Sequence, residues 1–188
     1  MAKKIGILVG SLRKGAFSRM IAKALMDLVP APFEMEEVEI GELPIFNQDW
    51  DDEGNPPAAW TAFRERVKTF DAILFVTPEY NRSVPPLLKN AVDIGSRPYG
   101  HNVWNRKPAA VVSVSPGGVG GFGANHHLRQ SLVCLNVPVM PQPEAYIGNA
   151  ASLFDAGGAL TSESTREFLH KFMAAFAIWI EANASKKP

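Results

Sequence analysis

Apolar residues along the chain gather in five short runs, and a segment with helical periodicity follows each of them. Residues 4–11, 72–77 and 109–115 are almost continuously apolar, which is typical of strands buried on both faces of a sheet. Residues 33–40 instead alternate apolar side chains with glutamates, and residues 137–147 contain three prolines. Both of these patterns predict strands at the edges of the sheet, and a slip in the alternation of residues 33–40 is typical of a bulge.

The helical segments carry their apolar side chains on one face, at spacings of three and four residues. Asn55 before two prolines predicts the start of a helix after a long connection over residues 41–57, and Ser164 with Glu167 has capping-box spacing at the start of the last helix. Five alternating strand and helix segments predict an α/β fold with three layers, in which a five-stranded parallel sheet of order 2-1-3-4-5 lies between helices. We expect one domain over residues 1–188, with ligands bound beyond the carboxyl ends of the strands.

Composition narrows the classes of partner. Lys and Arg together number 19, as do Asp and Glu, so the formal net charge is zero. A neutral chain argues against nucleic acids and anionic membranes as partners, because proteins that bind either usually carry a surplus of basic residues.

The first residues lack the pattern of a signal peptide, and no apolar run approaches the roughly 18 residues of a membrane span, so we expect a cytoplasmic protein. Cys134 is the only cysteine, which excludes an internal disulfide, and its apolar neighbours predict that it is buried.

The turn after the first strand has the composition of a phosphate site. It reads Gly-Ser-Leu-Arg-Lys-Gly-Ala-Phe-Ser-Arg over residues 10–19, and it opens the first helix. Free backbone N–H groups at a helix N-terminus, hydroxyl donors and cationic side chains together bind phosphate. We predict that Ser11, Arg13 and Ser18 hold the phosphate of a mononucleotide, together with the backbone N–H groups of Phe17 and Ser18. The alternative is an ordinary turn with a capping serine, and the lack of GxxxxGK[ST] argues against a P-loop.

The loop after the third strand has residues suited to hold a flat heteroaromatic ring. Such a ring needs backbone polar groups at its edge and a wall on which to stack. We predict that four consecutive residues held between prolines have this role, namely Pro78, Glu79, Tyr80 and Asn81. The alternative is a rigid turn in which Tyr80 packs on a neighbouring side chain.

The loop after the fourth strand, residues 115–123, contains five glycines, which let a backbone come close to a ligand. Gly118, Gly120 and Gly123 imitate the GxGxxG dinucleotide motif between a strand and a helix. That motif normally lies in the first strand-to-helix turn of its unit, so we favour a flexible loop that covers a ring. A fold that binds a nicotinamide dinucleotide is the alternative.

No set of side chains for acid–base or nucleophilic catalysis emerges from the sequence. His126 and His127 are adjacent and point about 100° apart on a helix, so they do not chelate one metal ion together. No serine lies in a GxSxG elbow. This pattern is typical of an enzyme whose cofactor performs the chemistry, and we predict neither catalytic side chains nor a metal site.

Together the three loops resemble those of the NADPH-dependent FMN reductase family, and within it the bacterial quinone and chromate reductases. The resemblance rests on residues 10–18, 77–85, 88–93 and 115–121, and it runs from residue 4 to about residue 180. It implies a flavodoxin-like fold that holds FMN. Carried onto this chain, it implies a phosphate site at Ser11, Arg13, Phe17 and Ser18, isoalloxazine contacts at Pro78, Glu79, Tyr80 and Asn81, and a second ring edge at Ser115, Gly117 and Gly118.

The resemblance also implies a reaction. NADPH or NADH passes hydride to the flavin and leaves, and a quinone or another small acceptor such as chromate takes its place, which gives ping-pong kinetics. Arg82 and Arg97 are candidates for binding the phosphates of the nicotinamide cofactor, and the favoured alternative for each is a solvated surface arginine. Phe46, Trp50 and Tyr99 are candidates for the border of the open face.

Relatives of this kind form dimers and tetramers, so we expect a homodimer or homotetramer. His126 stands where a relative has tyrosine at its tetramer contact, and Glu144 is its expected partner across that interface.

Two alternatives to a reductase come from other functional classes. One is a flavodoxin-like electron carrier, which the zero net charge disfavours, and the other is a flavin-based redox sensor without turnover.

Overall fold

In the computed structural model, which describes residues 2–184, five parallel strands form one sheet with the order β2-β1-β3-β4-β5. This order confirms the predicted sheet of order 2-1-3-4-5. The predicted domain also includes residue 1 and residues 185–188, which lie outside the described residues. The strands are β1 (Lys4–Val9), β2 (Glu34–Glu37), β3 (Ala72–Thr77), β4 (Ala109–Val114) and β5 (Ala145–Ile147).

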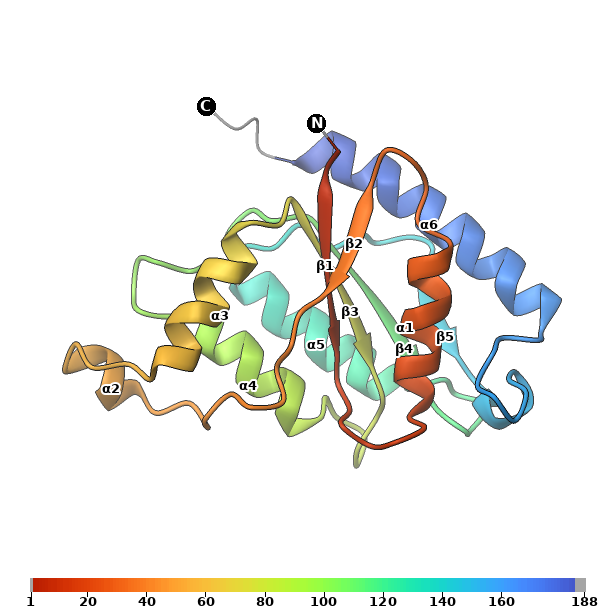
Figure 1. Cartoon of the computed structure of the whole chain (residues 1–188), viewed down its shortest axis with the longest axis horizontal. Helices are drawn as coiled ribbons and strands as arrows, with labels where there is room; N and C mark the ends of the chain where they lie inside the picture. The colour runs from red at the N-terminus through yellow and green to blue at the C-terminus, as the bar shows by residue number, and fades with distance from the viewer. Residues whose placement is uncertain (1, 185–188) are drawn as a thin grey trace.

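Helices cover both faces of the sheet and complete the three predicted layers (Figure 1). On one face, Leu25 and Phe172 share a core cluster with Leu74 of β3. On the other face, Trp60 shares a second cluster with Phe75 of the same strand. The first face carries α1 (Phe17–Asp27) and α6 (Glu163–Asn183), and the second carries α3 (Ala58–Lys68), α4 (Pro86–Gly95) and α5 (Phe122–Cys134).

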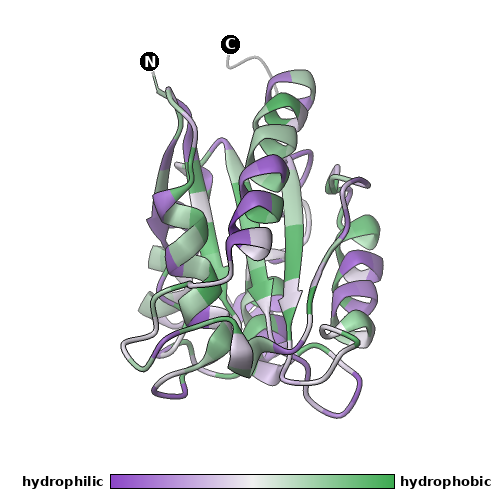
Figure 2. Cartoon of the chain, turned by 90° about the vertical axis from the view of Figure 1, so that its right-hand side faces the viewer, coloured by the Kyte–Doolittle hydropathy of each residue, from purple (hydrophilic) through white to green (hydrophobic). Residues whose placement is uncertain are grey.

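The apolar runs of the sequence form the middle layer. Figure 2 shows mostly apolar strands between helices in which apolar and hydrophilic residues alternate. Every residue of β3 and of β4 is buried, so both faces of these strands contribute to the hydrophobic stabilisation of the fold. In the described part of the chain, no helix combines the length and the apolar character needed to cross a membrane.

Both edge strands are shorter than predicted. All four residues of β2 pair with β1 in unbroken register, so the predicted bulge is wrong. β5 retains only three residues. The three prolines that precede it lack the N–H group that a ladder requires, and residues 137–144 form only one isolated bridge, through Val139.

The structure differs from the sequence-based expectation at three places. The hydroxyl of Ser162 accepts a hydrogen bond from the N–H of Thr165 at the start of α6, so the cap is not Ser164. A short helix, α2 (Gln48–Asp52), lies within the connection over residues 41–57. Cys134 ends α5 and is exposed rather than buried.

The carboxyl ends of β1 and β3 point to the lower end of the molecule in Figure 1. Gly10 donates a hydrogen bond from its N–H to the carbonyl of Val76 at 2.9 Å. A Cβ atom on Gly10 would lie only 3.0 Å from Cδ of Pro78 and 3.1 Å from Cγ of Pro85. The loops after β1 and β3 therefore touch, and the glycine is required for their close approach.

Candidate functional site

The turn between β1 and α1 leaves hydrogen-bond donors unused. Ser18 is 1% exposed, and its hydroxyl has no partner among the described residues. The backbone N–H groups of Phe17 and Ser18 likewise have no acceptor within the described chain. The N-cap of α1 is Ala16, which makes no side-chain cap, so the alternative of a capping serine is wrong. Because buried donors are normally paired, this cluster fits an anion with several oxygens, as FMN phosphate has.

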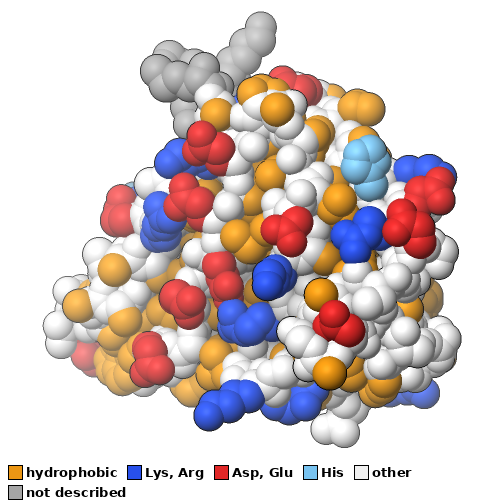
Figure 3. Space-filling model, turned by 45° about the vertical axis from the view of Figure 1, so that its right-hand side comes forward, with side chains coloured by type: hydrophobic (Ala, Val, Ile, Leu, Met, Phe, Trp, Pro, Cys, Tyr) orange, Lys and Arg blue, Asp and Glu red, His pale blue; other side chains and the backbone are white. Residues whose placement is uncertain are grey.

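Ser11 and Arg13 lie in the same turn and differ in exposure. Ser11 is 4% exposed, and its hydroxyl oxygen accepts from the N–H of Arg13 at 3.3 Å. The guanidinium of Arg13 is exposed, with one long hydrogen bond of 3.4 Å to the carbonyl of Gly15. No acidic side chain occupies the first turn of α1, so nothing there offsets the positive end of the helix dipole. Figure 3 shows Lys and Arg side chains along this lower end of the molecule.

The loop after β3 is a tight two-residue hairpin. The N–H of Tyr80 donates to the carbonyl of Ser83 at 3.1 Å, and the N–H of Ser83 donates back at 3.0 Å. Asn81 and Arg82 between them have φ angles of 52° and 63°, the pattern of a type I′ turn. Asn81 suits such a turn, whereas Arg82 is an uncommon residue there. Tyr80 is 47% exposed, so the alternative of a packed Tyr80 does not describe this loop.

Glu79 has a structural role that the sequence did not reveal. Its carboxylate accepts a hydrogen bond from the N–H of Ala124 at 3.0 Å, at the start of α5. It also lies 3.6 Å from the guanidinium of Arg82, and its side chain is only 13% exposed. A carboxylate at a helix N-terminus is stabilised by the unpaired N–H groups and the helix dipole. The side chain of Glu79 is therefore engaged with α5, and its backbone is the part left for a ring.

The glycine-rich loop after β4 combines open and crowded positions. A Cβ atom on Gly117 or Gly118 would meet nothing closer than 4.0 Å. A Cβ atom on Gly120 would lie 2.5 Å from the backbone of Tyr146, and one on Gly123 would lie 2.6 Å from the carbonyl of Arg82. Two glycines of the apparent GxGxxG motif are thus required by packing within the chain, which weighs against the dinucleotide alternative.

Ser115 begins this loop and orders it. Its hydroxyl donates to the carbonyl of Gly117 at 3.1 Å, and its own carbonyl accepts from the N–H of Ala150 at 3.2 Å. The carbonyl of Gly117 also accepts from the N–H of Asn149 at 3.2 Å. The predicted second ring edge is therefore held by the segment that follows β5, which sequence reasoning missed.

Each of the three loops also has an exposed apolar side chain. Leu12 is 60% exposed, Tyr80 47% and Val119 57%. Leu12 and Val119 were not singled out from the sequence, because a lone apolar residue in a loop carries no pattern.

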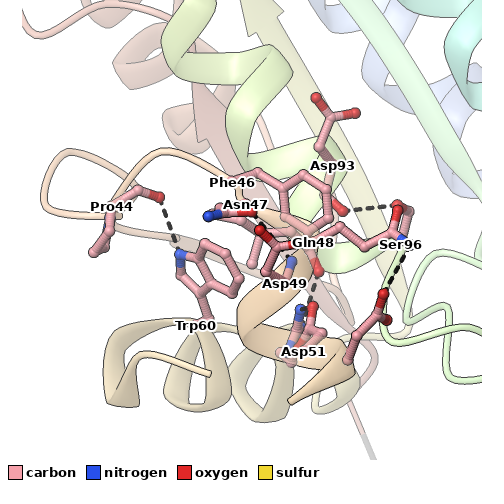
Figure 4. A network of polar contacts seen from close by, with 12 residues as sticks. Pro44, Phe46, Asn47, Gln48, Asp49, Asp51, Trp60, Asp93 and Ser96 are labelled. Carbon is pink, nitrogen blue, oxygen red and sulfur yellow. Dashed lines mark hydrogen bonds and ion pairs between the residues drawn. The ribbon is translucent and has the colours of Figure 1, made fainter. Parts of the chain in front are cut away.

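The connection over residues 41–57 turns its aromatic side chains inward. The rings of Phe46 and Trp50 lie 5.4 Å and 5.2 Å from that of Trp60, between centroids. Figure 4 shows Phe46 beside Trp60, whose indole N–H donates to the carbonyl of Pro44 at 3.0 Å. The expectation that Phe46 and Trp50 border the open face is therefore wrong. Ile45 is the exposed apolar residue of this segment, at 72%.

Arg97 and Tyr99 lie away from the site within one chain. They follow the end of α4, a helix of ten residues that begins beside the site and runs about 15 Å away from it. The guanidinium of Arg97 lies 6.0 Å from the ring centroid of Tyr99, which is 92% exposed. Of the two candidate arginines, only Arg82 lies at the carboxyl edge.

His126 and Glu144, the residues expected at an interface between copies, lie close together within one chain. Nε2 of His126 lies 4.0 Å from Oε1 of Glu144 and 2.8 Å from the hydroxyl of Tyr146. The ring of Phe122 lies 4.2 Å from that of His126. Among the described residues, no group of three His, Cys, Asp or Glu side chains is arranged to hold a metal ion.

The fold defines a class of protein, an α/β domain of flavodoxin-like topology, with unused hydrogen-bond donors at its first strand-to-helix turn. The model of the family described as NADPH-dependent FMN reductase matches residues 3–152. The chain belongs to this family, as the resemblance of its three loops implied. The expected cofactor, FMN with NADPH or NADH as co-substrate, is confirmed at the level of the family.

Known relatives are similar over almost their whole length. A quinone reductase from Pseudomonas putida is 56% identical and is covered, like this chain, over 95%. A 2-hydroxy-1,4-benzoquinone reductase from a Burkholderia species is 44% identical, with 96% of this chain and 97% of the relative covered. Among solved structures, the flavoenzyme NAD(P)H:(acceptor) oxidoreductase FerB from Paracoccus denitrificans has a TM-score of 0.90 at 39% identity, covering 98% of this chain and all of its own.

Proposed function

We propose that this protein is an FMN-containing NAD(P)H oxidoreductase that reduces quinones, with chromate as a further acceptor. The observation that carries the proposal is the buried, unpartnered hydroxyl of Ser18 beside two free N–H groups at the start of α1. Without a ligand, these groups lose their hydrogen bonds to water and gain none within the chain, which costs free energy of folding. The phosphate of FMN supplies the missing acceptors, and the relatives named for quinone reduction support the choice of acceptor.

Different residues bind the phosphate and the ring of FMN. Ser11, Arg13, Phe17 and Ser18 hold the phosphate through hydroxyl, guanidinium and backbone donors. Residues 78–81 and 115–118 hold the two edges of the ring, mainly through their backbones. Bound FMN supplies the hydride-transfer chemistry that the side chains at this edge do not offer. The chain itself positions the two substrates, which use the same opening in turn and so give ping-pong kinetics.

Exposed apolar side chains favour a planar, apolar acceptor. Tyr80 and Val119 expose apolar surface on the two loops proposed to hold the ring, and burial of that surface stabilises a bound quinone. We also propose a homodimer or homotetramer and a cytoplasmic location, where NAD(P)H is available.

The first test is the visible absorption spectrum of the purified protein, before and after anaerobic addition of NADPH or NADH. We expect flavin bands that bleach on addition, followed by recovery when a benzoquinone is added. Bands that persist with both nucleotides would instead favour a flavodoxin-like carrier or a redox sensor. A colourless protein that fails to take up FMN would contradict the proposed site.

A substitution tests the phosphate assignment directly. Arg13→Ala removes a charge-assisted hydrogen bond, so we expect FMN affinity to fall by about ten-fold or more. Lys23→Ala, an exposed cation further along α1, is the matched control and should retain FMN. A fully flavinated Arg13→Ala protein with unchanged affinity would remove Arg13 from the phosphate site.

A further inference from the structure

The connection between β5 and α6, residues 148–162, contacts both halves of the proposed FMN site. At its start, the N–H groups of Asn149 and Ala150 donate to the carbonyls of Gly117 and Ser115, each at 3.2 Å. These two hydrogen bonds hold the loop that is proposed to line one edge of the ring. The family model ends at residue 152, so most of this connection lies beyond the matched residues.

Further along, the same connection contacts the phosphate turn. The ring of Phe154 stacks on that of Phe17, with 6.2 Å between centroids and 17° between the ring planes. A Cβ atom on Gly158 would lie 3.4 Å from the Met20 side chain, one turn into α1. Phe17 and Met20 both belong to the first turn of α1, and the N–H of Phe17 is one of the unused donors.

The connection has internal hydrogen bonds that keep its shape. The carbonyl of Leu153 accepts from the N–H and the hydroxyl of Thr161, at 2.8 Å and 3.1 Å. The carboxylate of Asp155 accepts from the N–H groups of Gly157 and Ala159, both at 2.9 Å. Phe154 thus projects from a segment that is closed on itself, and its ring meets α1 in a defined position.

We infer that Phe154 is a positioning residue for the phosphate of FMN, an inference that rests on the function proposed above. Its ring fixes Phe17, and through Phe17 the first turn of α1 whose N–H groups and Ser18 hydroxyl receive the anion. Without the stack, the turn must be ordered when the phosphate binds, and that cost lowers affinity. The hydrogen bonds from this connection to the loop proposed to line the ring come from Asn149 and Ala150, so the ring of FMN should depend little on Phe154.

The test compares the dissociation constants of FMN and riboflavin for the apoprotein, measured by quenching of flavin fluorescence. Riboflavin lacks the phosphate, so the ratio of the two constants isolates the phosphate site. The variants are Phe154→Ala, Phe154→Leu, which keeps apolar bulk without a ring, and Phe154→Tyr, which keeps the ring. Val67→Ala, which removes buried apolar bulk from α3 on the other face of the sheet, is the control for general loss of stability.

We expect Phe154→Ala and Phe154→Leu to weaken FMN binding by about three- to ten-fold, the worth of a stacked aromatic pair, and riboflavin binding by less than about two-fold. Phe154→Tyr and Val67→Ala should keep the wild-type ratio. A large wild-type ratio that Phe154→Ala and Phe154→Leu leave unchanged would overturn the role of Phe154 alone. A wild-type ratio near one would overturn the phosphate assignment itself, and the role of Phe154 with it.

Discussion

Tyr146 is a residue whose protonation the fold changes strongly. Burial raises the pKa of its phenol to about 12, and the hydrogen bond to Glu144 adds to the effect. An unfolded tyrosine loses its proton near pH 10, so the unfolded state is favoured as pH rises from about 10 to about 12. We expect the free energy of unfolding to be unaffected by this group below about pH 10 and to fall above it. In a titration of tyrosinate absorbance, Tyr146→Phe should remove the last phase, and a titration that this variant leaves unchanged would contradict the assignment.

A comparison of alanine substitutions at Gly120 and Gly100 distinguishes the effect of backbone strain from that of steric crowding. Both have positive φ angles, of 66° and 84°, but only Gly120 faces a close neighbour, because a Cβ atom there would lie 2.5 Å from the backbone of Tyr146. Gly100→Ala should cost about 1 kcal/mol of unfolding free energy, from the left-handed conformation alone. Gly120→Ala should cost about 3 kcal/mol, because the backbone of β5 must also move. Urea denaturation measures both, and equal losses would show that the crowding is relieved cheaply.

Arg82 offers a test of the nicotinamide site. It lies at the tip of the hairpin after β3 with a side chain 77% exposed and a φ of 63°. Arg82→Ala should raise the KM for NADPH by about ten-fold, the worth of a charge-assisted bond to phosphate, while FMN content stays unchanged. Arg106→Ala is the matched control, because Arg106 also has a positive φ, of 58°, but lies beyond α4. Equal KM values in the wild type and both variants would exclude Arg82 from nucleotide binding.

At the scale of elements, a buried ion pair ties α2 to the body of the fold. The guanidinium of Arg64 donates to both carboxylate oxygens of Asp51, at 2.8 Å and 2.6 Å, and its Nε donates to the carbonyl of Ile94 at 2.9 Å. The two side chains are 8% and 2% exposed. Removal of one partner leaves the other charge buried without compensation.

We therefore expect Asp51→Asn to lower the free energy of unfolding by about 3 kcal/mol. Glu65→Gln, which breaks an exposed pair with Lys68 on the same helix, should cost less than about 0.5 kcal/mol. Chemical denaturation of the three proteins provides the comparison. Losses of similar size would mean that water reaches the Asp51–Arg64 pair and that α2 is not anchored by it.

At the scale of the whole molecule, the neutral net charge and large exposed apolar side chains favour self-association. The formal net charge is zero, so no long-range repulsion opposes the approach of a second copy. Large apolar side chains such as Ile45 and Tyr99 are 72% and 92% exposed. We expect sedimentation equilibrium to give two or four times the chain mass of 20.5 kDa. A single species of one chain mass over the whole concentration range would contradict the proposed oligomer.

The sequence by itself determined the order of the elements and indicated where a site is expected. The apolar runs of β3 and β4 have a strand's length and contain only one polar residue in their interiors, Ser113 of β4, so their burial between helices followed from local pattern. The glycines and donors around Ser18 likewise indicated a phosphate turn, because backbone freedom and hydrogen-bonding groups are properties of the residues themselves. The order of the sheet followed from alternation of strands and helices.

Only the tertiary structure decided which partner each side chain meets. Phe46 stacks inward on Trp60, the carboxylate of Glu79 caps α5, and the ring of Phe154 lies on Phe17. Each of these contacts joins segments that are distant along the chain, and periodicity reports only on neighbours within a few residues. Tertiary packing therefore determines which side chains are in contact, whereas the local pattern determines which segments form the sheet and which form the helices around it.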